Sequence, residues 1–111
     1  MRKQMIENAA HEVASQVRAV EESIEAALAQ LAELQARMIH ARSVTGAGFV
    51  ATHAAFEPLA ATTTSLIAAR GGIANCHSAL AETRKSIPGL RTVAFGDDDC
   101  PPKEAILRAV A

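Results

Sequence analysis

Residues 3–42, KQMIENAAHEVASQVRAVEESIEAALAQLAELQARMIHAR, contain neither glycine nor proline, and their charged residues are spread along the whole segment. Apolar or small residues recur in it at alternating spacings of four and three, at Ile6, Ala10, Val13, Val17, Val20, Ile24, Ala27, Leu31, Leu34, Met38 and Ala41. This alternation is the heptad pattern of a helix that packs along one face. At a rise of about 1.5 Å per residue such a helix extends roughly 60 Å, so it needs a partner along its whole length.

A second periodic segment follows a glycine-containing turn. Its recurring residues are Phe49, Thr52, Phe56, Leu59, Thr63, Leu66, Arg70, Ile73, His77, Leu80, Arg84 and Ile87. Residues that face each other in an antiparallel helix pair have numbers with a nearly constant sum. The two segments meet this condition with pairs that sum to 93, namely Leu34 and Leu59, Val20 and Ile73, Val13 and Leu80, and Ile6 and Ile87.

We therefore predict an all-α fold, a long antiparallel helical hairpin of coiled-coil type over residues 1–88. The expected elements are a helix over about 3–42, a turn over 43–48, and a second helix over about 49–87, which Pro88-Gly89 ends. Residues 89–111 are expected to form a tail with a short extended segment and, after Pro101-Pro102, a short helix over about 101–110.

Pro58 and the pair Gly71-Gly72 fall inside the second predicted helix. Proline costs roughly 3 kcal/mol in a helix interior, and each glycine roughly 1 kcal/mol relative to alanine. Because the heptad pattern continues through both places, we expect a kink at Pro58 and no break. The two glycines favour close backbone contact with a neighbouring helix.

The two predicted helices differ in charge. Residues 2–42 carry eleven charged side chains, whereas residues 44–81 carry only Glu57 and Arg70, and 22 of those 38 residues are Ala, Gly, Ser or Thr. A helix with uncharged faces in several directions needs more than one neighbouring helix. We therefore predict a homo-oligomer, a dimer in which two hairpins form a four-helix bundle. The residues expected at interaction surfaces are Leu28, Ile39, Ile67, Gly71 and Gly72 in the hairpin and Phe95, Ile106, Leu107 and Val110 in the tail.

Composition excludes several classes of function. The formal net charge of −1 argues against a nucleic-acid partner, and three Phe with no Trp or Tyr leave few rings for stacking on bases. Two cysteines are too few for a disulfide scaffold. The N-terminal residues are charged and do not resemble a secretory signal, and the low-charge stretch over 50–69 contains His53, Glu57 and Pro58. We expect a cytoplasmic protein with no membrane partner.

Polar residues occupy one column of the second segment: Thr63, Arg70, His77 and Arg84. Arg70 faces Ile24 in the predicted register, where an ion pair with Glu25 becomes possible. Such a column either fixes register and partner number or turns towards solvent. In the Cys76-His77 pair, side chains diverge by about 100°, so we predict a buried His77 and a Cys76 that points away from the contact face.

His40, His53 and Glu57 are the candidate metal ligands near the turn. Their pattern is incomplete, because zinc sites need three or four ligands and the two histidines project to opposite sides of the hairpin. Asp97, Asp98 and Asp99 lack the spacing of a calcium loop and are read as a solvated turn. No phosphate-binding glycine loop, nucleophile motif or acid–base pair is present in the sequence, so we expect no enzyme activity and no cofactor.

The sequence therefore predicts a non-enzymatic, oligomeric helical protein with a structural, assembly or adaptor function, whose tail contacts a protein partner. The alternative is a small-molecule- or metal-binding four-helix bundle that uses His40, His53 and Glu57. The alanine-rich hairpin with a short proline-containing tail resembles small bacterial or prophage-encoded proteins. That resemblance covers the architecture and implies no site residues.

Overall fold

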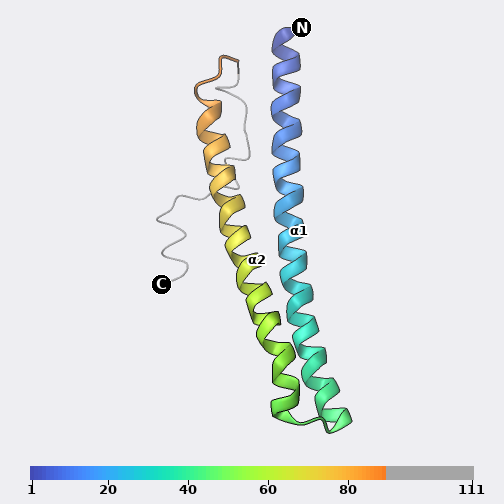
Figure 1. The fold of residues 1–111 in the computed structure, drawn as a ribbon. Coiled ribbons are helices and arrows are strands. Elements are labelled where there is room, and N and C mark those ends of the chain that lie inside the picture. The colour runs from blue at the N-terminus through green and yellow to red at the C-terminus, as the bar shows by residue number, and fades with distance from the viewer. Residues whose placement is uncertain (90–111) are drawn as a thin grey trace, which may run out of the picture. The chain divides into compact units, whose positions relative to one another are not determined.

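The computed structural model of the protein describes residues 1–89. They form two helices, α1 (Arg2–Thr45) and α2 (Phe49–Arg84), that pack against each other as an antiparallel hairpin (Figure 1). No residue from 1 to 89 belongs to a strand, so the predicted all-α hairpin is confirmed. The predictions for residues 90–111, including the helix over about 101–110 and the contacts of Phe95, Ile106, Leu107 and Val110, lie outside the described residues.

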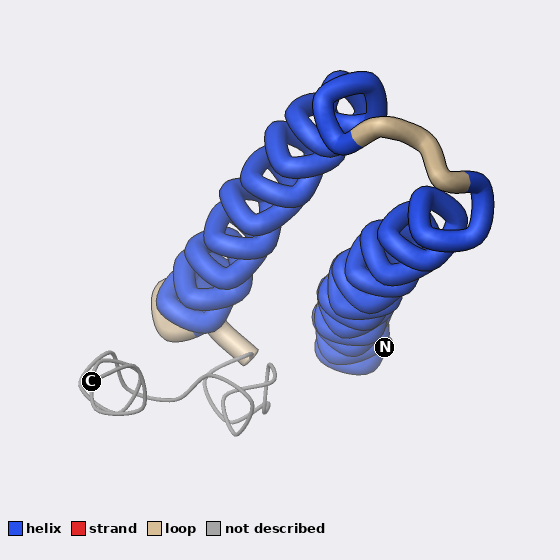
Figure 2. Tube along the Cα trace, turned by 90° about the horizontal axis from the view of Figure 1, so that it is seen from below, coloured by secondary structure: helices blue, strands red, loops and turns tan. Residues whose placement is uncertain are grey.

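α1 ends at Thr45, three residues later than predicted, and the loop to α2 is correspondingly short (Figure 2). Gly46 follows the helix with φ of 69°, a left-handed conformation that glycine adopts without steric cost. Its N–H still donates to the carbonyl oxygen of Arg42, at 3.0 Å. The Thr45 hydroxyl donates to the Ala41 carbonyl oxygen at 2.8 Å, which keeps the last residue of α1 in the helix.

α2 continues without a break through Pro58 and through Gly71-Gly72, as predicted. Pro58 is exposed, and the Thr62 hydroxyl donates to its carbonyl oxygen at 2.8 Å. Gly71 and Gly72 do not serve close packing within the described hairpin, because a Cβ added to either would meet no atom within 4 Å. Their expected close contact is therefore not made by α1.

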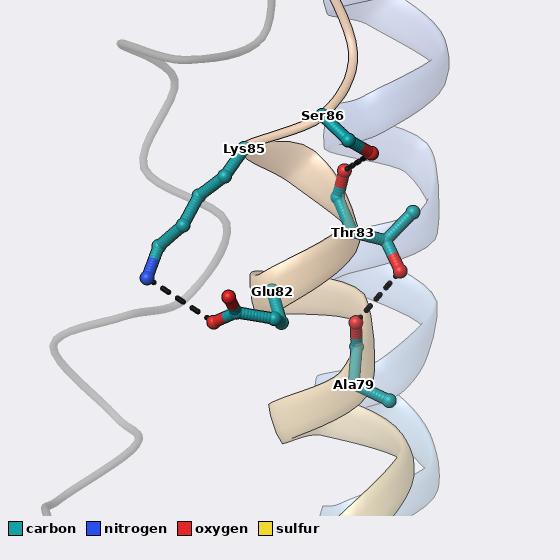
Figure 3. Close-up of polar contacts among 5 residues, drawn as sticks. All are labelled: Ala79, Glu82, Thr83, Lys85 and Ser86. Carbon is teal, nitrogen blue, oxygen red and sulfur yellow. Dashed lines mark hydrogen bonds and ion pairs between the residues drawn. The ribbon is translucent and has the colours of Figure 1, made fainter.

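α2 ends at Arg84, three residues earlier than predicted. Beyond it the backbone N–H groups of Lys85, Ser86 and Ile87 donate to carbonyl oxygens three residues back, at 3.0–3.2 Å. Pro88 explains this tighter ending, because the residue before a proline is driven out of the α-helical region. Side chains support the ending: Ser86 Oγ donates to the Thr83 carbonyl oxygen at 2.8 Å, and Lys85 Nζ lies 3.1 Å from a Glu82 carboxylate oxygen (Figure 3).

The hairpin forms two compact units, each with a part of both helices. The described residues of the terminal unit are 1–19 and 73–89, and the turn unit is Val20–Gly72. In the terminal unit Ala10 and Ala14 are buried, and Ile6, Leu80 and Ile87 pack against them. Val13 was predicted at this contact and is 43% exposed, so Ala14 takes its place.

In the turn unit the contact face is centred on Leu59, which is 8% exposed. The predicted contact residues that are half-buried here are Val20, Ile24, Ala27, Leu31, Met38, Thr52, Phe56, Thr63 and Leu66. Four other residues predicted on this face are exposed instead: Leu34, Ala41, Phe49 and Arg70. The heptad pattern therefore locates the centre of the contact face correctly and overestimates its width.

Two of the errors on α1 are displacements by one residue. Ala14 is buried next to the exposed Val13 in the terminal unit, and Arg42 is half-buried next to the exposed Ala41 in the turn unit, whereas the half-buried Ala27 keeps its predicted contact. The Arg42 guanidinium lies 5.5 Å from the centre of the Phe49 ring, a cation–π contact with the first residue of α2.

Candidate interaction surface

An open groove runs between the two helices on one side of the turn unit. Its volume is about 650 Å³, and it is lined by Ala27, Gln30, Leu31, Leu34, Thr62, Ser65, Leu66 and Ala69. A second groove of about 380 Å³ lies towards the turn and is lined by Met38, Ala41, Arg42, Thr45, Ala47, Ala51, Thr52, Ala55 and Phe56. The α1 residues of the two grooves follow one another at helical spacings, so both lie on one side of the hairpin, which we call the groove side.

The groove side includes α1 residues that α2 leaves exposed. Leu34 and Ala41 were predicted to contact α2 and instead line the grooves. The lining of the larger groove contains no charged residue, and neither does the α2 segment over residues 58–69. Three leucines, Leu31, Leu34 and Leu66, line the larger groove, and most of its other lining residues are small.

The opposite side of the turn unit, which we call the ion-pair side, carries charge. Arg70 Nε donates to Glu25 Oε1, as predicted from the sequence. That hydrogen bond and the Glu25 charge, with a smaller contribution from Glu21, raise the pKa of Arg70. Both side chains are more than half exposed, so the pair contributes less than about 1 kcal/mol to stability.

The two sides are distinguished by helix geometry. Successive helical residues turn by about 100°, so Ala69 in the groove and Arg70 in the ion pair lie on either side of the contact face. In the same way Ser65 and Ile67 lie on either side of Leu66. Ile67 therefore belongs to the ion-pair side, where it is 56% exposed.

The hairpin residues that the sequence predicts at interaction surfaces lie elsewhere. Leu28 is half-buried, Ile39 and Ile67 are exposed, and none of the three lines either groove. Gly71 and Gly72 are exposed as well. The groove was missed because its α1 residues were assigned to the contact with α2; the uncharged α2 segment 58–69 was the available signal.

The candidate metal ligands do not assemble in the described residues. His53 Nε2 lies 3.3 Å from Glu57 Oε1, one helical turn away, and both side chains are exposed. His40 is exposed on α1, and no group of three or more His, Cys, Asp or Glu side chains suited to a metal ion occurs within residues 1–89. Asp97, Asp98 and Asp99 lie outside that range.

The Cys76-His77 pair follows the sequence prediction. His77 is 5% exposed, which makes it one of the most buried residues of the described chain, and Cys76 is an exposed free thiol. Because the two residues are adjacent in α2, their side chains point in directions about 100° apart. His77 is therefore packed in the hairpin, and Cys76 lies at its surface.

A small apolar patch lies at the turn, where Val44, Phe49 and Val50 are exposed. Phe49 was predicted to pack between the helices and is instead 71% exposed, with the Arg42 guanidinium near one face of its ring. The connection between α1 and α2 is only Gly46-Ala47-Gly48, so few residues are present at the turn to cover these apolar side chains.

Comparison with models of known protein families, with curated proteins and with solved structures gives no match to this chain. Among the helices described here, none combines the length and the apolar character needed to cross a membrane.

Proposed function

We propose that this protein is a non-enzymatic, homo-oligomeric helical protein with a structural, assembly or adaptor function. The observation that supports the proposal most directly is the small core of the hairpin. In residues 1–89 the buried residues are Ala10, Ala14, Leu59 and His77, and no side chain in that range is fully buried. Association with another helical surface adds the burial that a two-helix hairpin cannot provide by itself.

The free energy gained by burial in a single hairpin is small compared with the entropy cost of ordering the chain. Ordering one residue costs about 1–2 kcal/mol of backbone entropy, whereas complete burial of a leucine contributes about 1.5–3 kcal/mol. Alanine has little side-chain area to bury, and two of the four buried residues are alanines. Isolated helix pairs of this kind gain most of their stability from additional packing of their apolar faces.

The charge distribution suits a structural function. Charged side chains are spread along α1, while α2 is nearly uncharged between its start and Glu82. In a bundle of two hairpins, the uncharged segment of α2 packs against the second hairpin, and the charged residues of α1 face solvent. The turn patch of Val44, Phe49 and Val50 is exposed and is a candidate contact for a second protein, whereas the tail contact that the sequence predicts lies outside the described residues.

Light scattering behind size-exclusion chromatography tests the proposal on the untagged full chain over a hundredfold range of concentration. We expect a mass near twice the chain mass of 11.6 kDa, with a melting temperature that rises with protein concentration. A stable, helical monomer at every concentration would contradict the proposal. Such a monomer would mean that the small core suffices.

A further inference from the structure

We propose that the groove side of the turn unit is the oligomer interface and that a second copy of this chain occupies it, groove side against groove side across a two-fold axis. This inference rests on the proposed oligomeric function and adds the location of the interface. It differs from the location that the sequence suggested, because none of Leu28, Ile39, Ile67, Gly71 and Gly72 lines either groove.

An apolar heptad column of α1 is only partly covered by α2. Ala27, Leu34 and Ala41 repeat every seven residues along α1, a spacing that keeps them in one line along the helix. This line borders the grooves: Ala27 is half-buried, whereas Leu34 is 47% exposed and Ala41 is exposed. A heptad column of this kind packs against a helix, so the exposed part of the line is available to a further helix.

The two sides of the turn unit differ in charge. The larger groove is lined by uncharged residues, whereas the ion-pair side presents Glu25 and Arg70. An acidic or basic partner finds no opposite charge in that groove, so such a surface selects against it. A second copy presents the same uncharged lining, so pairing of the two larger grooves buries no unpaired charge there. Arg42 lines the smaller groove, where its guanidinium lies 5.5 Å from the Phe49 ring centre of its own chain.

Shape and area also suit a second copy. Small residues line the groove, such as Thr62, Ser65 and Ala69, and allow close approach of a helix. The Thr62 hydroxyl donates to the Pro58 carbonyl oxygen of its own helix at 2.8 Å. The α1 part of the turn unit, residues 20–45, is roughly 38 Å long at about 1.5 Å per residue, and two adjacent helices are roughly 18 Å wide. The footprint is then roughly 700 Å² per copy, or roughly 1,400 Å² in total, which lies within the range of stable interfaces.

Two matched variants test the location. Leu34→Glu places a carboxylate on the groove side, and Ile67→Glu places one on the ion-pair side, at a residue of similar exposure. Both are compared with the wild-type chain by light scattering and sedimentation equilibrium. We expect Leu34→Glu to raise the dimer dissociation constant at least a hundredfold, because the dimer would bury an unpaired charge, and Ile67→Glu to change it by less than threefold.

A third variant keeps the interface testable if Leu34→Glu does not fold. Ala69→Glu changes the α2 wall of the same groove at an exposed position, so it leaves the hairpin contact untouched. It should weaken the dimer as Leu34→Glu does, with an unchanged helical circular dichroism spectrum. If Leu34→Glu loses helicity, Ala69→Glu decides the result.

The outcomes separate the inference from the function on which it rests. A wild-type dimer that both groove variants leave intact would overturn the interface and retain the oligomeric function. Dissociation by Ile67→Glu with intact groove variants would also overturn it and would place the interface on the ion-pair side. A monomeric wild-type chain would contradict the proposed function itself.

Discussion

Leu59 is the largest buried side chain in the described hairpin, and its truncation measures how much the contact face contributes. Leu59→Ala removes roughly three carbon atoms from a position that is 8% exposed. At about 0.8 kcal/mol for each buried methylene, the transfer contribution is about 2 kcal/mol. The term for an enclosed cavity should be small, because the ion-pair side of the contact face stays open to water and the space left by the side chain is not enclosed. We therefore expect a loss near the lower end of the usual range for leucine, about 2 kcal/mol.

Urea denaturation followed by circular dichroism at 222 nm measures this loss. All variants are compared at one protein concentration, because dissociation and unfolding are coupled in an oligomer. Ile67→Ala is the matched control, since it removes a similar volume from a side chain that is 56% exposed, and it should cost about 1 kcal/mol or less. Equal losses for the two variants would refute the packing described here and show that Leu59 is no more buried in solution than Ile67.

Three further substitutions test the backbone and the ion pair. Gly71→Ala should raise the free energy of unfolding by up to about 1 kcal/mol, because the added Cβ meets no atom within 4 Å and alanine favours the helix; a loss measured by urea denaturation would indicate a close contact there. Gly46→Ala should lower stability by about 1 kcal/mol in the same assay, because φ at this residue is 69°, and an unchanged midpoint would contradict the left-handed cap. Arg70→Gln should cost less than about 1 kcal/mol at low salt, and the difference from wild type should shrink in about 1 M salt; a larger or salt-independent loss would show that the Glu25 pair is more than a surface contact.

The hairpin could be predicted from the sequence because two long-range regularities agree. The heptad spacing of residues 3–42 predicts one helix, and the constant pair sum predicts that the second helix returns antiparallel to it. The Arg70–Glu25 contact follows from that register and is present in the structure. The helix ends were less accurate, because hydrogen bonds of Thr45 and the restriction by Pro88 act over a few residues and leave no periodic signal.

The interaction surface could not be located from the sequence. Two neighbouring columns of α1, one with Val13 and Ala41 and the other with Ala14 and Arg42, lie on either side of the contact centre. Apolar character assigns the first column to α2, whereas in the structure Val13 and Ala41 are exposed and Ala14 and Arg42 are the more buried neighbours. This exchange between neighbouring residues leaves the heptad spacing of the sequence unchanged, so only the structure reveals which residues of the column stay open.

The exposed Leu34 needs an explanation, because it is a large apolar side chain on the surface of the hairpin. A single exposed apolar residue is ordinary on a protein surface, but Leu34 belongs to a heptad line with Ala27 and Ala41 and borders an α2 segment of twelve uncharged residues, 58–69. If solvent were the intended neighbour, charged residues could occupy these places at no cost to the hairpin, as they do elsewhere along α1. Their absence from the lining of the larger groove on both helices, together with the Glu25–Arg70 pair on the opposite side, is the pattern expected of a surface that a second uncharged helical face covers.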